Sequence, residues 1–136
     1  MRSSVTVSGG GIIGNYIASR LTSNNIESLV VEKSDGNNQS ENIRTLTLNP
    51  YSKKLLDDIG IKIPCAEIKT IKVFEGEGSG KIDFKAEEIN EDNLSYVVFF
   101  NELQNLLQDE VLEKTLFKSE IRTVSYTHLR AHETSQ

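Results

Sequence analysis

The stretch Val5-Thr6-Val7-Ser8-Gly9-Gly10-Gly11-Ile12-Ile13-Gly14 decides how the chain begins to fold. Valines that alternate with polar residues predict a short strand over residues 3–8. A helical pattern of apolar residues then predicts a helix over residues 12–23. The last six residues of the quoted stretch form a Gly-x-Gly-x-x-Gly motif between the two, a context typical of turns that bind the phosphates of a dinucleotide.

Each glycine of this motif has its own physical task. Gly9 permits the tight turn out of the strand, Gly11 leaves room for a pyrophosphate against the backbone, and Gly14 lets the helix approach the strand closely. The helix N-terminus adds unpaired N–H groups and the positive end of the helix dipole. The sequence therefore predicts a pyrophosphate site here, and Ile13, in the first helical turn, is included among its residues.

A second apolar run, Ser28-Leu29-Val30-Val31-Glu32, predicts a buried parallel strand that completes a β-α-β unit of the Rossmann type. Glu32 ends this strand 18 residues after Gly14 (32 − 14), where an acidic residue is expected to bind the ribose hydroxyls. A carboxylate there would repel a 2′-phosphate, so NADP is disfavoured at this site. The alternative is a glycine-rich turn in another α/β protein with a coincidental glutamate.

Local signals predict the remaining elements. Asn49-Pro50 is typical of a helix start and Gly60 of its end. A glycine-rich loop between two strand-like runs predicts a hairpin. The full set comprises a loop at 33–42, an edge strand at 44–48, strands at 69–74, 81–84 and 96–98, a helix at 99–113 and a last strand at 116–124.

Apolar residues at helical spacing predict which helix faces are buried. In the first helix these residues are Ile13, Ile17, Ala18 and Leu21. Phe99 and Phe100, which open the helix over residues 99–113, are expected in the core rather than on a stacking surface.

Composition limits the classes of function. The chain of 136 residues carries 15 Lys+Arg against 20 Asp+Glu, a net charge of −5, which disfavours nucleic-acid binding because phosphate contacts need basic residues. One cysteine permits no internal disulfide and no cysteine-built zinc site, and fits a reducing compartment. No apolar run is long enough to span a membrane. We therefore expect a cytoplasmic chain that binds no metal.

The chain resembles the FAD-dependent aromatic hydroxylases related to para-hydroxybenzoate hydroxylase, and among them most closely the ubiquinone-biosynthesis hydroxylases. The resemblance covers roughly residues 3–113 and rests on the runs VSGGGIIGNYIASRL, LVVEK, NIRTLTLNPYSKKLLDDIGI and YVVFFNELQNLL. The element Arg44-Thr45-Leu46-x-Leu48, followed by a Ser-containing helix, separates this family from plain NAD-binding Rossmann domains. The implied fold class is α/β: an FAD-type Rossmann domain with the start of an inserted antiparallel sheet.

The resemblance also implies FAD contacts. The three glycines of the motif would hold the pyrophosphate. Outside the motif, Glu32 would bind the ribose and Lys33 would lie beside the adenosine. Arg44 would lie against the diphosphate or the flavin, and Gln104 would fall where the family often places a polar or basic contact. In this chain Phe99 and Phe100 replace the acidic residue and the asparagine that the family usually carries after its YVV-like strand.

The implied activity is hydroxylation of a small aromatic ring, a ubiquinone precursor with or without a prenyl chain, with oxygen and NADPH or NADH. The catalytic residues are unknown, and none is implied in this segment. The resemblance divides the chain into FAD-binding parts at 1–66 and 99–124 and the start of a substrate-side sheet at 67–98. It also implies that the full-length parent associates peripherally with the inner membrane or with a ubiquinone-biosynthesis complex.

Three alternatives stay open at the level of sequence. They are an NAD-dependent oxidoreductase with the same β-α-β unit, a different FAD enzyme such as an amine oxidase or a prenyl-group reductase, and a non-catalytic dinucleotide-binding module. Residues 125–136, SYTHLRAHETSQ, resemble translated sequencing-adapter DNA, so we expect a non-native tail on a truncated, N-terminal part of a longer enzyme that is inactive alone. His128 and His132 in this tail are expected to bind no metal.

Overall fold

The computed structural model describes residues 4–38 and 43–122. Strand β1 (Val5–Ser8), helix α1 (Ile12–Ser23) and strand β2 (Ser28–Val31) form the predicted β-α-β unit, with β1 and β2 parallel. Strand β8 (Thr115–Leu116) adds to the other edge of β2 in the same direction, so the sheet order is β1-β2-β8. The α/β class is therefore confirmed.

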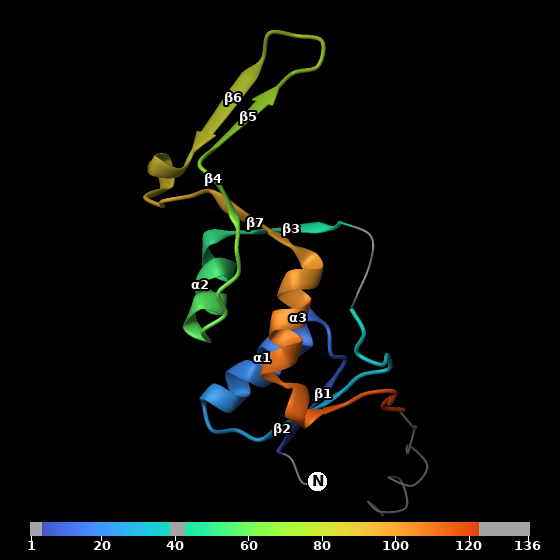
Figure 1. Cartoon of the computed structure of the whole chain (residues 1–136). Helices are drawn as coiled ribbons and strands as arrows, with labels where there is room; N and C mark the ends of the chain where they lie inside the picture. The colour runs from blue at the N-terminus through green and yellow to red at the C-terminus, as the bar shows by residue number, and fades with distance from the viewer. Residues whose placement is uncertain (1–3, 39–42, 123–136) are drawn as a thin grey trace, which may run out of the picture.

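An antiparallel sheet forms the second layer of the body (Figure 1). Its order is β3 (Thr45–Leu48), β7 (Ser95–Phe99) and β4 (Ala66–Ile68). Helices α2 (Pro50–Asp58) and α3 (Phe100–Glu110) bury their apolar sides against it. The buried residues of this core are Leu48, Leu56, Val98, Leu103 and Leu107 of these elements, together with Ile61 and Ile63 from the segment between α2 and β4.

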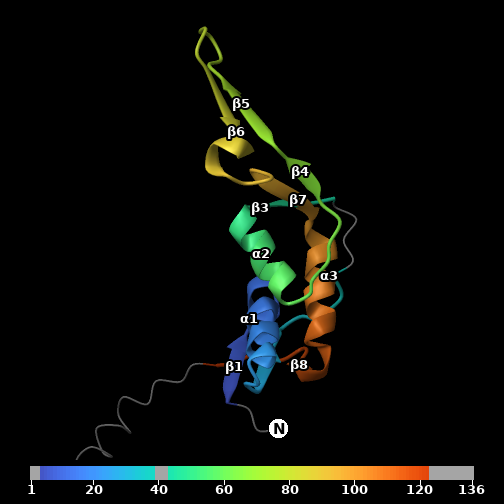
Figure 2. The same ribbon diagram turned by 90° about the vertical axis from the view of Figure 1, so that its left-hand side faces the viewer.

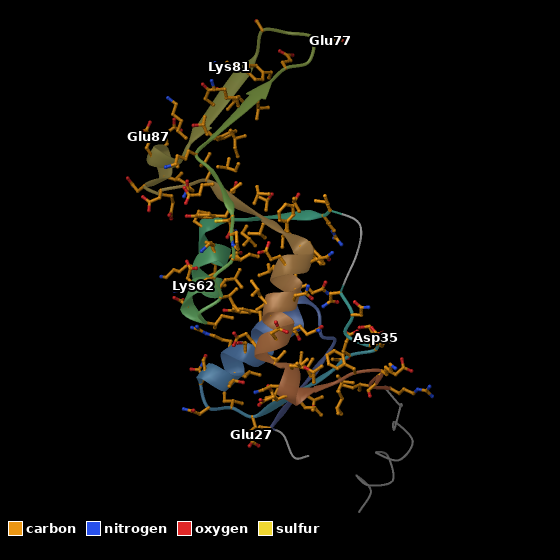
Figure 3. All side chains as sticks on the ribbon, viewed as in Figure 1. Glu27, Asp35, Lys62, Glu77, Lys81 and Glu87 are labelled. Atoms are coloured by element: carbon orange, nitrogen blue, oxygen red, sulfur yellow. The ribbon has the colours of Figure 1, made fainter. Side chains whose placement is uncertain are left out.

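A two-stranded hairpin projects away from this body (Figure 2). It consists of β5 (Thr70–Phe74) and β6 (Lys81–Lys85), which pair antiparallel as the sequence predicts. The loop that carries Glu77 lies at its far end (Figure 3). Two 3-10 turns complete the described elements, η1 (Ala86–Ile89) and η2 (Leu112–Lys114).

Capping residues act where the sequence places them. The Asn49 side chain accepts a hydrogen bond from the Ser52 N–H at 2.7 Å, and Pro50 takes the first helical position. Asn24 caps the end of α1, and Gly60, at a φ of +80°, follows the end of α2. These boundaries follow from the sequence because each signal acts within one turn of the backbone.

The predicted buried face of α1 is wrong in part. Ala18 is fully buried, but Ile13 is 71% and Ile17 43% exposed. The side of α1 that is buried instead carries small residues and an amide: Asn15, Ala18 and Ser19. Small residues on that side bring the helix axis close to β1 and β2, and this approach turns the two isoleucines outward.

Two further expectations near the C-terminal part of the described chain need correction. Phe99 ends β7 and is 52% exposed, so it is not a core residue. The predicted strand over residues 116–124 is reduced to Thr115–Leu116, because Lys118 adopts a φ of +54°, which an extended strand does not permit. Residues 123–124, and the tail at 125–136 with both histidines, lie outside the described residues. In the described part, no helix has the length and apolar character needed to cross a bilayer.

Candidate dinucleotide-binding site

The turn from β1 into α1 depends on glycine at two positions. Gly9 has a φ of +103°, a conformation that other residues avoid, and its N–H donates to the Val31 carbonyl at 2.8 Å. A Cβ built on Gly14 would lie 2.0 Å from the Gly9 carbonyl oxygen, so any side chain there would displace backbone. These two glycines bring the helix N-terminus against the end of the strand.

Open space lies beside Gly11, the N-cap residue of α1. A Cβ at this position would meet no atom within 4 Å, and no side chain caps the helix. The first backbone hydrogen bond of the helix runs from the Asn15 N–H to the Gly11 carbonyl, at 3.0 Å. The N–H groups of Ile12 and Ile13 therefore have no acceptor among the described residues. The Ile13 side chain is largely exposed beside this backbone N–H.

The Glu32 carboxylate closes one side of the turn. One oxygen accepts from the Gly10 N–H at 2.8 Å, and the other accepts from the Ser34 N–H at 2.8 Å. These hydrogen bonds, that from Ser34 first and that from Gly10 second, hold the pKa of Glu32 below its ordinary value. Glu32 is thus a fixed anion directly beside the glycine turn.

The loop after β2 is attached to helix α3 by a side chain that sequence reasoning missed. Gln108 donates to the Gly36 carbonyl at 2.8 Å and accepts from the Asn38 side chain at 3.0 Å. Nothing in the pattern marks Gln108, because it lies 72 residues from Gly36 in the sequence. Lys33 starts the same loop and is largely exposed, with its Nζ 3.6 Å from a Glu120 carboxylate oxygen.

Arg44 and Gln104 lie at elements other than β2, the strand that Glu32 directly follows. Arg44 precedes β3, and its guanidinium lies over the Phe100 ring at 4.3 Å from the ring centroid. Gln104 is half-buried one turn further along α3. Among the described residues, neither side chain makes a hydrogen bond to the glycine turn or to Glu32.

An apolar hollow links α1 with β3. It has a volume of about 150 Å³ and is lined by Ile12, Ile13 and Tyr16 of α1, by Leu46 and Leu48 of β3, and by residues of α2 and α3. The helix that follows the glycine turn therefore shares one concave surface with the strand that follows Arg44.

These features fit a bound dinucleotide. The space beside Gly11 is free, the adjacent helix N–H groups lack acceptors, and Glu32 supplies carboxylate oxygens on the β2 side. A helix N-terminus of this kind attracts a phosphate through its N–H groups and its dipole. The residues present can thus hold a pyrophosphate and an adjoining ribose.

Over the part that this chain covers, the fold is similar to that of solved monooxygenase structures. The structure of p-nitrophenol 4-monooxygenase PnpA from Pseudomonas putida superposes with a TM-score of 0.69 and 18% identity, over 90% of this chain and 33% of PnpA. PqsL, a probable FAD-dependent monooxygenase from Pseudomonas aeruginosa, gives 0.70 and 16%, over 90% of this chain and 35% of PqsL. The rebeccamycin biosynthetic enzyme RebC, with reduced flavin, gives 0.62 and 21%, over 90% and 26%.

The chain thus spans about a third of the length of PnpA and PqsL. No family model and no curated protein sequence matches it. The structural likeness concerns the fold.

Proposed function

We propose that this chain is the N-terminal FAD-binding part of a flavin monooxygenase that hydroxylates an aromatic ring. The observation that carries the proposal is the combination of an open glycine turn, a helix N-terminus without a cap, and the Glu32 carboxylate beside Gly10. The fold shared with PnpA, PqsL and RebC favours FAD over NAD as the dinucleotide.

The geometry of the turn supports the following roles. Gly9 and Gly14 shape the backbone, and Gly11, with the N–H groups of Ile12 and Ile13, receives the pyrophosphate. Around the turn, Glu32 accepts from the ribose hydroxyls with the lone pairs that its two backbone hydrogen bonds leave free.

The roles outside the turn rest on the sequence resemblance. Lys33 lies beside the adenosine, Arg44 meets the diphosphate or the flavin, and Gln104 provides a polar contact. The hollow between α1 and β3 supports this placement of Arg44 near the flavin. It gives the cofactor a path from the glycine turn toward the strand that follows Arg44.

Bound FAD would supply the redox chemistry, with NADPH or NADH as reductant and oxygen as co-substrate. The part of the protein described here contributes binding and orientation of the cofactor. PqsL has been solved in complex with 2-aminobenzoylacetate, an aromatic compound, which supports an aromatic substrate for this chain's parent as well. Within that class we assign the parent to the ubiquinone-biosynthesis hydroxylases, on the sequence resemblance.

The proposal extends to organisation and location. Residues 1–66 and 99–124 belong to the FAD-binding domain, and residues 67–98 begin the substrate-side sheet. Residues 125–136 are a non-native tail. The parent is cytoplasmic and associates with the inner membrane or a ubiquinone-biosynthesis complex at its surface. The chain alone is expected to bind FAD without hydroxylating, because the FAD-dependent structures of the same fold are about three times as long.

The test is FAD binding by the purified chain, followed by flavin fluorescence, with a matched pair of glycine variants. Gly11→Ala adds a methyl group to the open space of the turn, and Gly76→Ala adds the same group to open space in the loop of the hairpin. We expect saturable FAD binding by the wild type and by Gly76→Ala, and a loss of at least about tenfold in affinity for Gly11→Ala.

Two results would contradict the proposal. Saturable NAD binding without FAD binding would favour the NAD-dependent oxidoreductase. Equal FAD affinity in all three proteins would show that FAD does not bind at the glycine turn. NADPH-dependent hydroxylation by the chain alone would contradict only the expectation that it is inactive.

A further inference from the structure

Asn15 is a buried amide in the first turn of α1, directly behind the glycine turn. It is 1% exposed, and its Nδ2 donates to the Gly10 carbonyl at 3.0 Å. Its Oδ1 is also buried and has no hydrogen-bond partner among the described residues. The Asn15 amide therefore makes one hydrogen bond to the turn, through Nδ2, while its buried Oδ1 is left without a partner among the described residues.

Gly10 is held on both of its peptide groups. Its N–H donates to Glu32 at 2.8 Å, and its carbonyl accepts from Asn15. In a trans peptide the C=O and the N–H of the same unit point in opposite directions. Since the Gly10 carbonyl is turned inward to a buried side chain, the N–H of Gly11 in that unit is turned outward. A Cβ built on Gly11 would meet no atom within 4 Å.

We infer that Asn15 is a positioning residue for the cofactor: it fixes the peptide unit between Gly10 and Gly11 so that the Gly11 N–H faces the pyrophosphate. The inference rests on the proposed FAD site and adds to it a residue outside the glycine motif. Without the Asn15 hydrogen bond, this peptide unit could rotate, because glycine on both sides of it leaves the backbone torsions free.

Stability alone does not account for an asparagine at this position. The buried Oδ1 without a partner is costly, and the hydrogen bond from Nδ2 to the Gly10 carbonyl only offsets that cost. Replacement of Asn15 by leucine removes the unpaired Oδ1 but leaves the buried Gly10 carbonyl without its donor, so the two effects on stability are expected to nearly cancel while the hold on the Gly10 carbonyl is lost. For a merely structural asparagine, the same substitution would lower the stability and leave the affinity for ADP unchanged.

The experiment compares Asn15→Leu with Asn24→Leu in the full chain. Asn24 is the matched control because its Nδ2 also donates to a backbone carbonyl of α1, that of Arg20 at 2.9 Å, at the other end of the helix. Stability is measured by urea unfolding, and affinity is measured for FAD, for ADP as a pyrophosphate probe, and for adenosine as a probe without phosphates.

For Asn15→Leu we expect nearly unchanged stability, FAD and ADP affinities about tenfold lower, and unchanged adenosine affinity. For Asn24→Leu we expect slightly lower stability and unchanged affinities. If Asn15→Leu does not fold, Asn15→Ala decides, since it cannot overpack: the inference then requires weaker ADP binding with adenosine binding retained.

Two outcomes overturn the inference in distinguishable ways. If the wild type and Asn15→Leu bind FAD equally well, the role of Asn15 is overturned. The proposed function then still stands. A wild type that binds neither FAD nor ADP overturns the proposed function, and the role of Asn15 with it.

Discussion

The guanidinium of Arg44 lies over the ring of Phe100, 4.3 Å from its centroid, and the Phe100 N–H donates to the Arg44 carbonyl at 2.8 Å. Side chain and backbone thus join the start of β3 to the start of α3. A cation–π contact uses the face of the guanidinium and leaves its in-plane N–H donors available to an anion. No carboxylate among the described residues accepts from them.

The first prediction concerns this stack. Phe100→Leu removes the ring and is expected to lower the FAD affinity severalfold, because Arg44 is no longer held, and to cost about 1 kcal/mol of stability. Phe100→Tyr keeps the ring face and should bind FAD like the wild type. Phe99→Leu is the control, since Phe99 is adjacent and half exposed. Fluorescence titration and urea unfolding check both quantities, and equal FAD affinity in Phe100→Leu and Phe100→Tyr would rule the role out.

The second prediction separates two glycines of one motif. Gly14→Ala forces a Cβ to 2.0 Å from the Gly9 carbonyl oxygen and is expected to cost about 3 kcal/mol of unfolding free energy, as overpacking against backbone does. Gly11→Ala has open space and should cost less than about 1 kcal/mol. Urea unfolding without FAD measures both, and equal losses in the two variants would contradict this reading of the turn.

The third prediction concerns pH and Glu32. Its pKa is lowered in the folded chain, so its contribution to stability is present above the ordinary value of 4.5 and is lost as pH falls through the folded pKa. At neutral pH, Glu32→Gln is expected to be about 1 kcal/mol less stable than the wild type, with allowance for solvent screening. The difference should shrink below pH 4.5.

The control for this measurement is Glu27→Gln, which makes the same charge change. Glu27 is exposed, and its carboxylate has no hydrogen bond or ion pair among the described residues (Figure 3). Thermal melts of the three proteins across acid and neutral pH provide the data. A difference between wild type and Glu32→Gln that does not change with pH would show that the hydrogen bonds to Gly10 and Ser34 do not depend on the charge.

The fourth prediction concerns the exposed apolar face of the hairpin. Ile71 pairs with Phe84 and Val73 with Ile82, and all four side chains are 42–56% exposed on one face. A two-stranded hairpin with an uncovered apolar face favours association. Val73→Thr with Ile82→Thr keeps the β-branched side chains and should reduce self-association in concentration-dependent light scattering, with unchanged circular dichroism. Lys72→Thr, on the other face, is the control and should not reduce it.

The elements themselves were predictable where the signals are local. The glycine motif, the Asn49-Pro50 start, the Gly60 stop and the hairpin loop each act within a few residues, and the structure has an element boundary or a turn at each of them. Glu32 was also identified from its spacing alone, and its side chain lies against Gly10.

Contacts between distant segments were not predictable in the same way. The attachment of Gln108 to Gly36 and the stack of Arg44 on Phe100 join residues with no shared periodicity. The outward position of Ile13 likewise depends on how closely α1 approaches the sheet. An apolar pattern states that a helix has a face to bury but not which neighbour is near enough to cover it.

By itself, then, the sequence determined the β-α-β order, the glycine turn and the acidic residue beside it, because backbone torsions and helix capping are short-range effects. Only the tertiary structure decided that Asn15 holds the Gly10 carbonyl, that Gln108 fastens the loop after β2, and that Phe100 lies under Arg44. Those contacts depend on packing, in which burial and hydrogen bonding select partners by distance in space rather than by distance along the chain.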